Sequence, residues 1–281
     1  MSENTIKKLP PRKLPPMSAL EFAIANVFRH FFFGLRMAVL WAILMVPLLA
    51  LVWFVAFHGA VPDFNAPKPE AIAGLAAIAV FALLASFSIA VNWHRRIILN
   101  QKPERFGWVR LNGVVWRYLF GFLLVWIILG VIIAGAAASA MLLPTSLADK
   151  LGPVAKPLGI GLAVLLGLFA LFSWYRLSTW LPAIAIGDKD YSPGTAWRVT
   201  RRNLWAFLGF TFWLVFTLAT AGAMGAGAFF GQQALGNPWA TGAAFSFIGL
   251  LAWLCLFLVM TVAASHYAFF SECDVFPKDE T

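Results

Sequence analysis

Residues 203–271 read NLWAFLGFTFWLVFTLATAGAMGAGAFFGQQALGNPWATGAAFSFIGLLAWLCLFLVMTVAASHYAFFS, a stretch without a single Asp, Glu, Lys or Arg. A helix needs about 20 apolar residues to cross the hydrocarbon core of a bilayer, so the stretch has room for two. The polar, turn-rich segment Gly231–Pro238 divides it near the middle. We therefore predict two membrane-spanning helices, over about 207–230 and 243–267.

Four further apolar runs precede this stretch, at about 37–57, 71–93, 118–143 and 158–176. Hydrophobic residues make up 61% of the 281-residue chain and charged residues 12%, whereas soluble domains have about 45–50% and 25%. The runs are apolar on every side, unlike the alternating strands of a membrane barrel. The predicted fold class is an all-α integral membrane protein with six transmembrane helices in three hairpins.

The distribution of Lys and Arg predicts the orientation of the chain. All but three of the 21 fall on one side of the predicted membrane, and the exceptions are Lys68, Lys150 and Lys156. The side rich in positive charge is normally cytoplasmic. We therefore expect a multi-pass protein of the bacterial inner membrane with both termini in the cytoplasm. The expected organisation is a disordered basic, Pro-rich tail at 1–17, one membrane domain at 18–270 and a short acidic cytoplasmic tail at 271–281, with no cleavable signal peptide.

Each predicted hairpin is preceded by a cytoplasmic segment with the pattern of an amphipathic helix. Ser18–Glu21 has the pattern of a capping box before an apolar helical period. Apolar residues between Trp108 and Val115 fall on one helical face. Ser192 and Pro193 form an N-cap followed by proline at the first helical position. These segments are expected to lie in the membrane interface.

An internal repeat is suggested by the ends of the second and fourth spans, Trp93–Arg95 and Trp174–Arg176. A pair of tryptophans follows each of them at the same spacing. The alternative is that Trp and Arg are simply enriched at every membrane interface. On either interpretation, six residues are expected to be interface anchors: Trp93, Trp108, Trp116, Trp174, Trp197 and Trp205.

The segment Leu177–Ile186 is apolar, too short to span a membrane and interrupted by Pro182. Two placements are open: an extension of the fourth helix along the interface, or a segment that folds back into the protein.

The predicted spans contain no acidic residue, the four histidines lie near helix ends, and no nucleotide-binding or nucleophile motif is found. Cys255 and Cys273 provide no disulfide framework. We expect no catalytic site, no metal and no cofactor, and therefore no enzyme.

Arginines at the inner membrane boundary are the strongest candidate site. Guanidinium groups bind phosphate through paired hydrogen bonds, so a cluster of them could hold an anionic lipid headgroup. The candidate residues are Arg95, Arg96, Arg176, Arg201 and Arg202. The simpler alternative is that they only fix the topology.

Two functions remain open from the sequence. The first is a non-enzymatic membrane protein that binds or organises anionic lipid, or assembles with a membrane-protein partner or a second copy of itself. The alternative is a transporter or permease subunit for a small or lipidic solute. The net charge of +9 lies in short segments between apolar runs, which favours lipid over nucleic acid as partner.

The segments 173–187 and 196–205 resemble a recurrent stretch in uncharacterised bacterial six-span inner-membrane proteins. The layout of the spans is also similar to the membrane domain of some glycerophosphodiester phosphodiesterases. The catalytic domain of those enzymes has no counterpart among these residues, so the resemblance implies an arrangement of helices and not their activity.

Overall fold

The computed structural model describes residues 13–57, 69–103, 108–146, 150, 152–235 and 238–271. Within these ranges every regular element is a helix and no β-strand occurs. Six helices are long and apolar enough to cross a membrane. They are α3 (Phe31–Phe57), α4 (Pro69–Leu99), α5 (Gly113–Ser146), α7 (Ala155–Ser178), α10 (Leu204–Leu235) and α11 (Pro238–Phe270).

The predicted turn between the last two spans is shorter than expected. Helix α10 continues to Leu235, through most of the polar segment that was predicted to be a turn, and α11 begins at Pro238. Gln and Ala are good helix formers, so α10 continues through this segment, and proline suits the first position of α11.

Helix α2 (Pro16–Arg29) lies against α11 and α10. The predicted capping box at Ser18–Glu21 is wrong, because the N-cap is Pro15 and no side chain caps the helix. Proline suits the first helical position, and Pro16 there fixes the N-cap three residues earlier than predicted. Residues 14–17, which were expected to belong to a disordered tail, are part of the fold. Leu14 is buried, and its backbone N–H donates to Asn203 Oδ1 at 2.6 Å.

The amphipathic helix predicted around Trp108–Val115 is not present in the described residues 100–103 and 108–112. Instead α5 begins at Gly113, with Asn112 Oδ1 accepting from the Val114 N–H at 3.2 Å. The connection is held on α4, because the Arg110 N–H donates to Ser88 Oγ at 2.9 Å. The repeated unit is therefore incomplete in this second copy.

The third predicted helix is present as α9 (Pro193–Val199). Ser192 is its N-cap, as predicted, and accepts from the Thr195 N–H at 3.1 Å. The helix ends sooner than the pattern indicated, so Arg201 and Arg202 lie in the turn before α10.

The segment Leu177–Ile186 folds into the protein. Helix α7 ends at Ser178, and the short helix α8 (Trp180–Ile186) follows and packs against α4 and α5. Pro182 lies in its first turn, where proline costs no hydrogen bond. Gly187 then ends α8 in a left-handed conformation, with φ of 85°.

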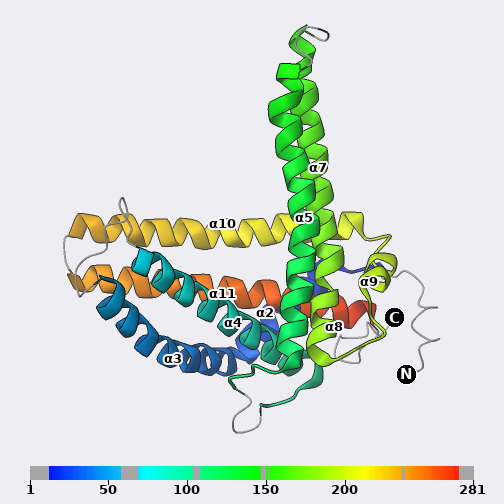
Figure 1. Ribbon diagram of the computed structural model, residues 1–281. Helices are drawn as coiled ribbons and strands as arrows, with labels where there is room; N and C mark the ends of the chain where they lie inside the picture. The colour runs from blue at the N-terminus through cyan, green and yellow to red at the C-terminus, as the bar shows by residue number, and fades with distance from the viewer. Residues whose placement is uncertain are drawn as a thin grey trace.

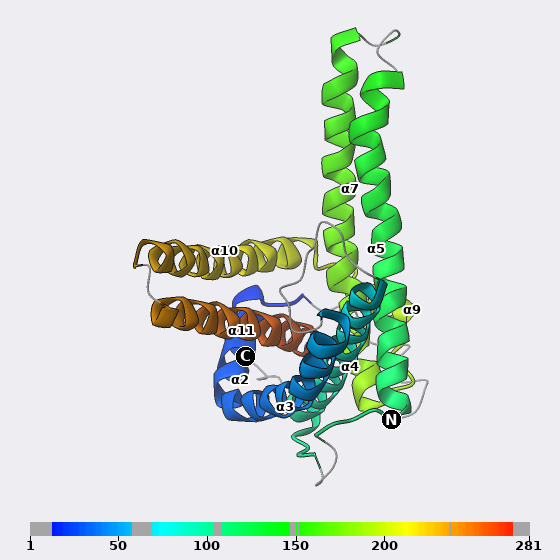
Figure 2. The same ribbon diagram turned by 60° about the vertical axis from the view of Figure 1, so that its left-hand side comes forward.

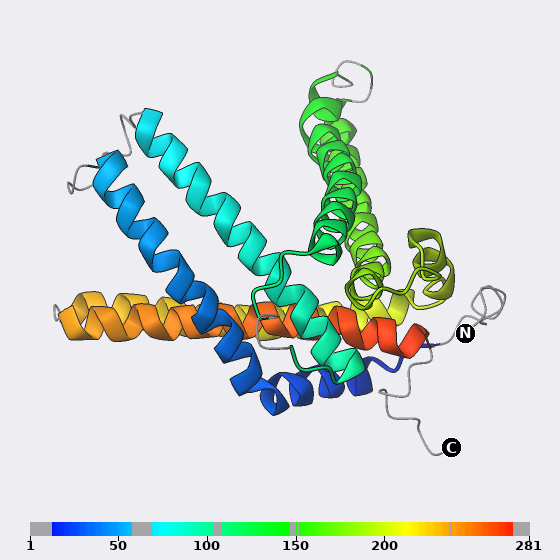
Figure 3. The ribbon, with the colours of Figure 1, turned by 60° about the horizontal axis from the view of Figure 1, so that its bottom comes forward.

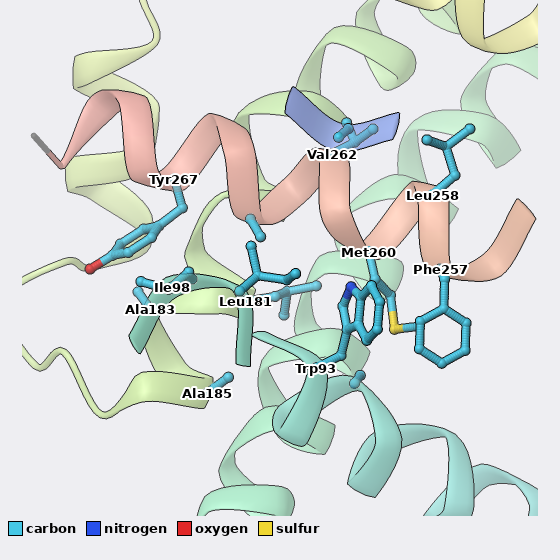
Figure 4. Close-up of a cluster of buried hydrophobic side chains, with 14 of the residues drawn as sticks. Trp93, Ile98, Leu181, Ala183, Ala185, Phe257, Leu258, Met260, Val262 and Tyr267 are labelled. Carbon is cyan, nitrogen blue, oxygen red and sulfur yellow. The ribbon is translucent and has the colours of Figure 1, made fainter. Parts of the chain in front are cut away.

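Consecutive long helices pack side by side as α3 with α4, α5 with α7, and α10 with α11. The three pairs meet at one end and leave it in different directions (Figures 1 and 3). We call the common end the hub and define it by the buried cluster around Trp93, Tyr175, Leu181, Phe207 and Tyr267. Figure 4 shows part of it, with Trp93 beside Phe257 and Met260 of α11.

The helix pairs run in clearly different directions. The axes of α5 and α7 point away from the direction that α10 and α11 share (Figure 2). Helices that cross one bilayer tilt by no more than about 40° from its normal. Crossing of a single bilayer by all six helices therefore requires the pairs to turn towards one another about the hub.

Candidate functional site

Arg95 and Arg96 lie in the last turns of α4 and bond to backbone and amide oxygens. Arg95 donates to the Ala185 carbonyl oxygen at 3.1 Å and to Gln101 Oε1 at 2.8 Å. Arg96 donates to the Asn100 carbonyl oxygen at 3.2 Å. These bonds place positive charge at the carbonyl ends of α8 and α4, where the helix dipoles favour it.

Arg176 is buried and does not reach the surface. Its Nε donates to Thr200 Oγ1 at 3.0 Å, and its Nη2 donates to the Trp197 carbonyl oxygen. The guanidinium carbon lies 4.8 Å from the centre of the Phe172 ring and 3.8 Å from that of Trp197. Arg176 therefore holds α9 against α7.

The three arginines do not converge on one headgroup position, in contrast to the expectation from the matching ends of α4 and α7. Their guanidinium groups bond to three different parts of the chain. Arg176 is more deeply buried than Arg95 and Arg96, although their sequence positions are similar. The reason is that α9 covers the end of α7, whereas the connection after α4 leaves Arg95 and Arg96 half-buried.

Arg201 and Arg202 are exposed, and so is Arg198 on α9, which was not among the candidate residues expected from the sequence. Within the described part of the chain, none of the three makes a side-chain hydrogen bond or an ion pair. Trp205, which is 83% exposed, and Leu204 follow at the start of α10. Exposed guanidinium groups beside an exposed indole are typical of the membrane headgroup region.

The six predicted interface anchors fall into two groups. Trp116, Trp197 and Trp205 are exposed residues, although one face of the Trp197 ring is covered by Arg176. Trp93, Trp108 and Trp174 are buried or half-buried.

The buried group makes internal contacts instead. Trp93 is fully buried and donates to Thr261 Oγ1 at 2.8 Å, so it is a core residue and not an anchor. The Trp108 ring is covered by Arg36, whose guanidinium carbon lies 4.5 Å from its centre. Trp93 therefore has no surface to offer the headgroups, and the half-buried Trp108 and Trp174 offer only part of theirs.

A polar network that the sequence analysis missed joins the loop after α8 to α11. Tyr267 donates to Asp188 Oδ2 at 2.6 Å, and Asp188 Oδ1 accepts from the backbone N–H groups of Asp190 and Tyr191. Tyr191 in turn donates to Thr179 Oγ1 at 3.1 Å. Burial raises the pKa of Tyr191, so its hydroxyl keeps its proton. No spacing rule predicts this network, because Asp188 and Tyr267 are distant in the sequence.

Among the described residues, no group of three or more His, Cys, Asp or Glu is placed to bind a metal ion. His58 and Cys273 lie outside those residues. His94 and His266 are both buried and lie on different helices of the hub.

Comparison of the chain with protein-family models, with curated proteins and with solved structures finds no match. The two resemblances described above therefore stay predictions.

Proposed function

We propose that this chain is a non-enzymatic multi-pass protein of the bacterial inner membrane that binds anionic phospholipid on the cytoplasmic leaflet. The binding residues are Arg201 and Arg202 of the site expected from the sequence, together with Arg198. Arg95, Arg96 and the buried Arg176 of that expected site are not included, because they bond to other parts of the chain. The observation that carries the proposal is that these three guanidinium groups are exposed and without protein partners in the described chain.

The surroundings of the three arginines support a lipid ligand. Trp205 and Leu204 are exposed directly beside them, so apolar side chains can enter the acyl region while the guanidinium groups stay at phosphate depth. Each basic residue near an anionic surface contributes about 1 kcal/mol of attraction. Arginine adds paired hydrogen bonds to phosphate oxygens.

The orientation of the chain also supports this leaflet. The turn that holds Arg201 and Arg202 belongs to the side with nearly all of the Lys and Arg. Anionic lipids attract such segments to the cytoplasmic surface.

Native mass spectrometry of the purified protein tests the proposal by counting the anionic phospholipids that stay bound. The test variant is Arg201→Gln with Arg202→Gln. The matched control is Lys150→Gln with Lys156→Gln, which removes two exposed charges from the opposite side of the predicted membrane. We expect the test variant to retain fewer anionic lipids and the control to match the wild type. Equal retention by all three proteins would overturn the proposal and leave the arginines as topology signals.

A further inference from the structure

A cavity of about 310 Å³ lies in the hub, between residues of α4, α5, α7, α8, α10 and α11. This volume is about twice that of an engineered apolar cavity that binds benzene. None of the described residues that line it is Asp, Glu, Lys or Arg. The cavity is therefore large enough for part of a small organic molecule and suited to an uncharged one.

The lining changes from exposed to buried along the helices. On α4, Leu83 is 52% exposed, whereas Ala90 and His94 are buried. On α11, Leu256 is 47% exposed and Met260 is buried. Leu83 precedes the hub residues of α4 by one helical turn, and Leu256 is an exposed neighbour of Phe257 on α11. The cavity is thus closed at the hub and borders the apolar space between the helix pairs, which hydrocarbon fills in a membrane.

The closed end carries hydrogen-bonding groups. His94 Nε2 lies 3.1 Å from the Tyr118 hydroxyl oxygen, and both residues line the cavity. His94 Nδ1 is buried and has no hydrogen-bond partner among the described residues. A buried polar atom without a partner costs free energy that a ligand group could recover. The tautomer of His94 determines whether that group must accept or donate.

We propose that this cavity binds a neutral lipid whose uncharged carbonyl or hydroxyl group hydrogen-bonds to the His94–Tyr118 pair and whose hydrocarbon tail leaves past Leu83 and Leu256. A charged headgroup would lose its hydration here without a counter-charge to replace it, so phospholipids and ionised fatty acids are excluded. The site is separate from the arginines of the proposed function and requires no phosphate. Two kinds of lipid carry an uncharged carbonyl or hydroxyl group on a hydrocarbon tail. One has a ring as headgroup, such as an isoprenoid quinone, and the other has an open-chain headgroup, such as a monoacylglycerol.

The aromatic residues that line the cavity bear on the choice between a ring-headed and an open-chain lipid. Phe87, Phe122 and Trp174 surround the cavity, and the rings of Phe87 and Phe122 are 5.1 Å apart in an edge-to-face arrangement. Such rings offer flat faces and polarised edges to a planar headgroup. Titration with both kinds of lipid distinguishes the sources.

The experiment measures the thermal unfolding midpoint of the purified protein in detergent against increasing concentrations of three probes. A ligand that binds only the folded state raises the midpoint in a concentration-dependent way. The probes are a short-tailed benzoquinone, monoolein, and oleate at a pH where it is ionised. We expect a saturable rise with at least one neutral probe and none with oleate.

Two variants on α11 test whether the rise of the unfolding midpoint comes from binding in the cavity. Ala263→Leu places a larger side chain in the cavity, and Ala252→Leu makes the same change at an exposed position of the same helix outside it. We expect the rise to vanish in the first and to persist in the second. His94→Phe should require about fivefold more probe for the same rise, the usual effect of losing one neutral hydrogen bond.

The absence of a rise with both neutral probes would overturn the proposal, as would equal rises in the two alanine variants. A rise with oleate as large as that with the neutral probes would overturn the assignment of an uncharged headgroup. The variant with Arg201→Gln and Arg202→Gln should respond to the neutral probes like the wild type, so a failure of this site and a failure of the phospholipid site are distinguishable.

Discussion

The guanidinium carbon of Arg176 lies 3.8 Å from the centre of the Trp197 indole ring, and the same side chain donates to the Trp197 carbonyl oxygen. One arginine thus contacts both the ring and the backbone of a single residue of α9. The contact joins the end of α7 to the element that leads into α10, and so connects two of the three helix pairs at the hub.

We expect Arg176→Gln to lower the free energy of unfolding by about 3 kcal/mol. The change removes hydrogen bonds from a charged donor, each worth about 1.5–3 kcal/mol when buried, and a cation–π contact. The thermal midpoint should fall by about 6 °C or more. Arg198→Gln, at an exposed position of α9, is the control and should change stability by less than about 0.5 kcal/mol. Equal midpoints for the two variants would show that the contact does not hold α9.

Gly34 of α3 lies where three aromatic rings approach the backbone. A Cβ atom at this position would lie 3.0 Å from Phe257, 3.1 Å from Trp253 and 3.2 Å from Trp93. We expect Gly34→Ala to destabilise the protein by about 1–3 kcal/mol, because rings packed on one another cannot all move aside. Gly130→Ala, with no atom near the added methyl group, should instead stabilise α5 by about 0.5–1 kcal/mol. If Gly34→Ala and Gly130→Ala changed the thermal midpoint in the same direction, the close packing of the three rings on Gly34 would be contradicted.

His30 predicts a pH dependence of stability. Burial, followed by the positive charges of Arg96 and Arg29, lowers the pKa of His30 below its usual value of about 6.5. The unfolded chain then binds a proton at this residue at a higher pH than the folded chain does, so stability decreases as the pH falls below about 6.5. The thermal midpoint of the wild type should therefore fall more between pH 7.5 and 5.5 than that of His30→Gln. Other titrating groups affect the midpoint of both proteins, so the test is the difference between the two falls. An equal fall in the wild type and in His30→Gln would contradict the prediction.

The orientation of the chain is tested by labelling single cysteines, introduced after Cys255 and Cys273 are changed to Ser. The distribution of Lys and Arg predicts that Lys150 lies outside the cytoplasm and Arg201 inside. A membrane-impermeant thiol reagent added to intact cells should therefore label Lys150→Cys and spare Arg201→Cys until the inner membrane is permeabilised. Reversed labelling, or periplasmic activity of a reporter fused after Thr281, would refute cytoplasmic termini.

The divergence of the helix pairs leads to a distance prediction. Spin labels on Val164 of α7 and Val215 of α10, both exposed, report the separation of two pairs. We expect the two labels to lie closer together in liposomes than the divergent directions of α7 and α10 in Figure 1 imply, because all six helices must tilt by less than about 40° to cross one bilayer. Labels on Ile127 and Val164, within the α5–α7 pair, should keep their separation. Unchanged distances for both label pairs in liposomes would show that the helix pairs do not turn about the hub.

The positions of the six long helices could be predicted from the sequence, because a bilayer imposes a length and an apolar surface on each of them independently of its neighbours. The N-cap of α9 could also be predicted from neighbouring residues alone, since Ser192 and Pro193 act on the turn that directly follows them. Neither prediction required knowledge of which helices pack together.

The roles of individual side chains were decided by the tertiary structure. Arg95 and Arg176 end similar sequence segments, yet one is half-buried at the end of α8 and the other is enclosed beneath α9. The pairing of His94 with Tyr118 and the bond from Tyr267 to Asp188 each join different parts of the hub. Burial and hydrogen bonding depend on what lies across the interface from a residue, and the hydrophobic pattern of a single helix determines only that its surface is apolar, not which neighbour covers it.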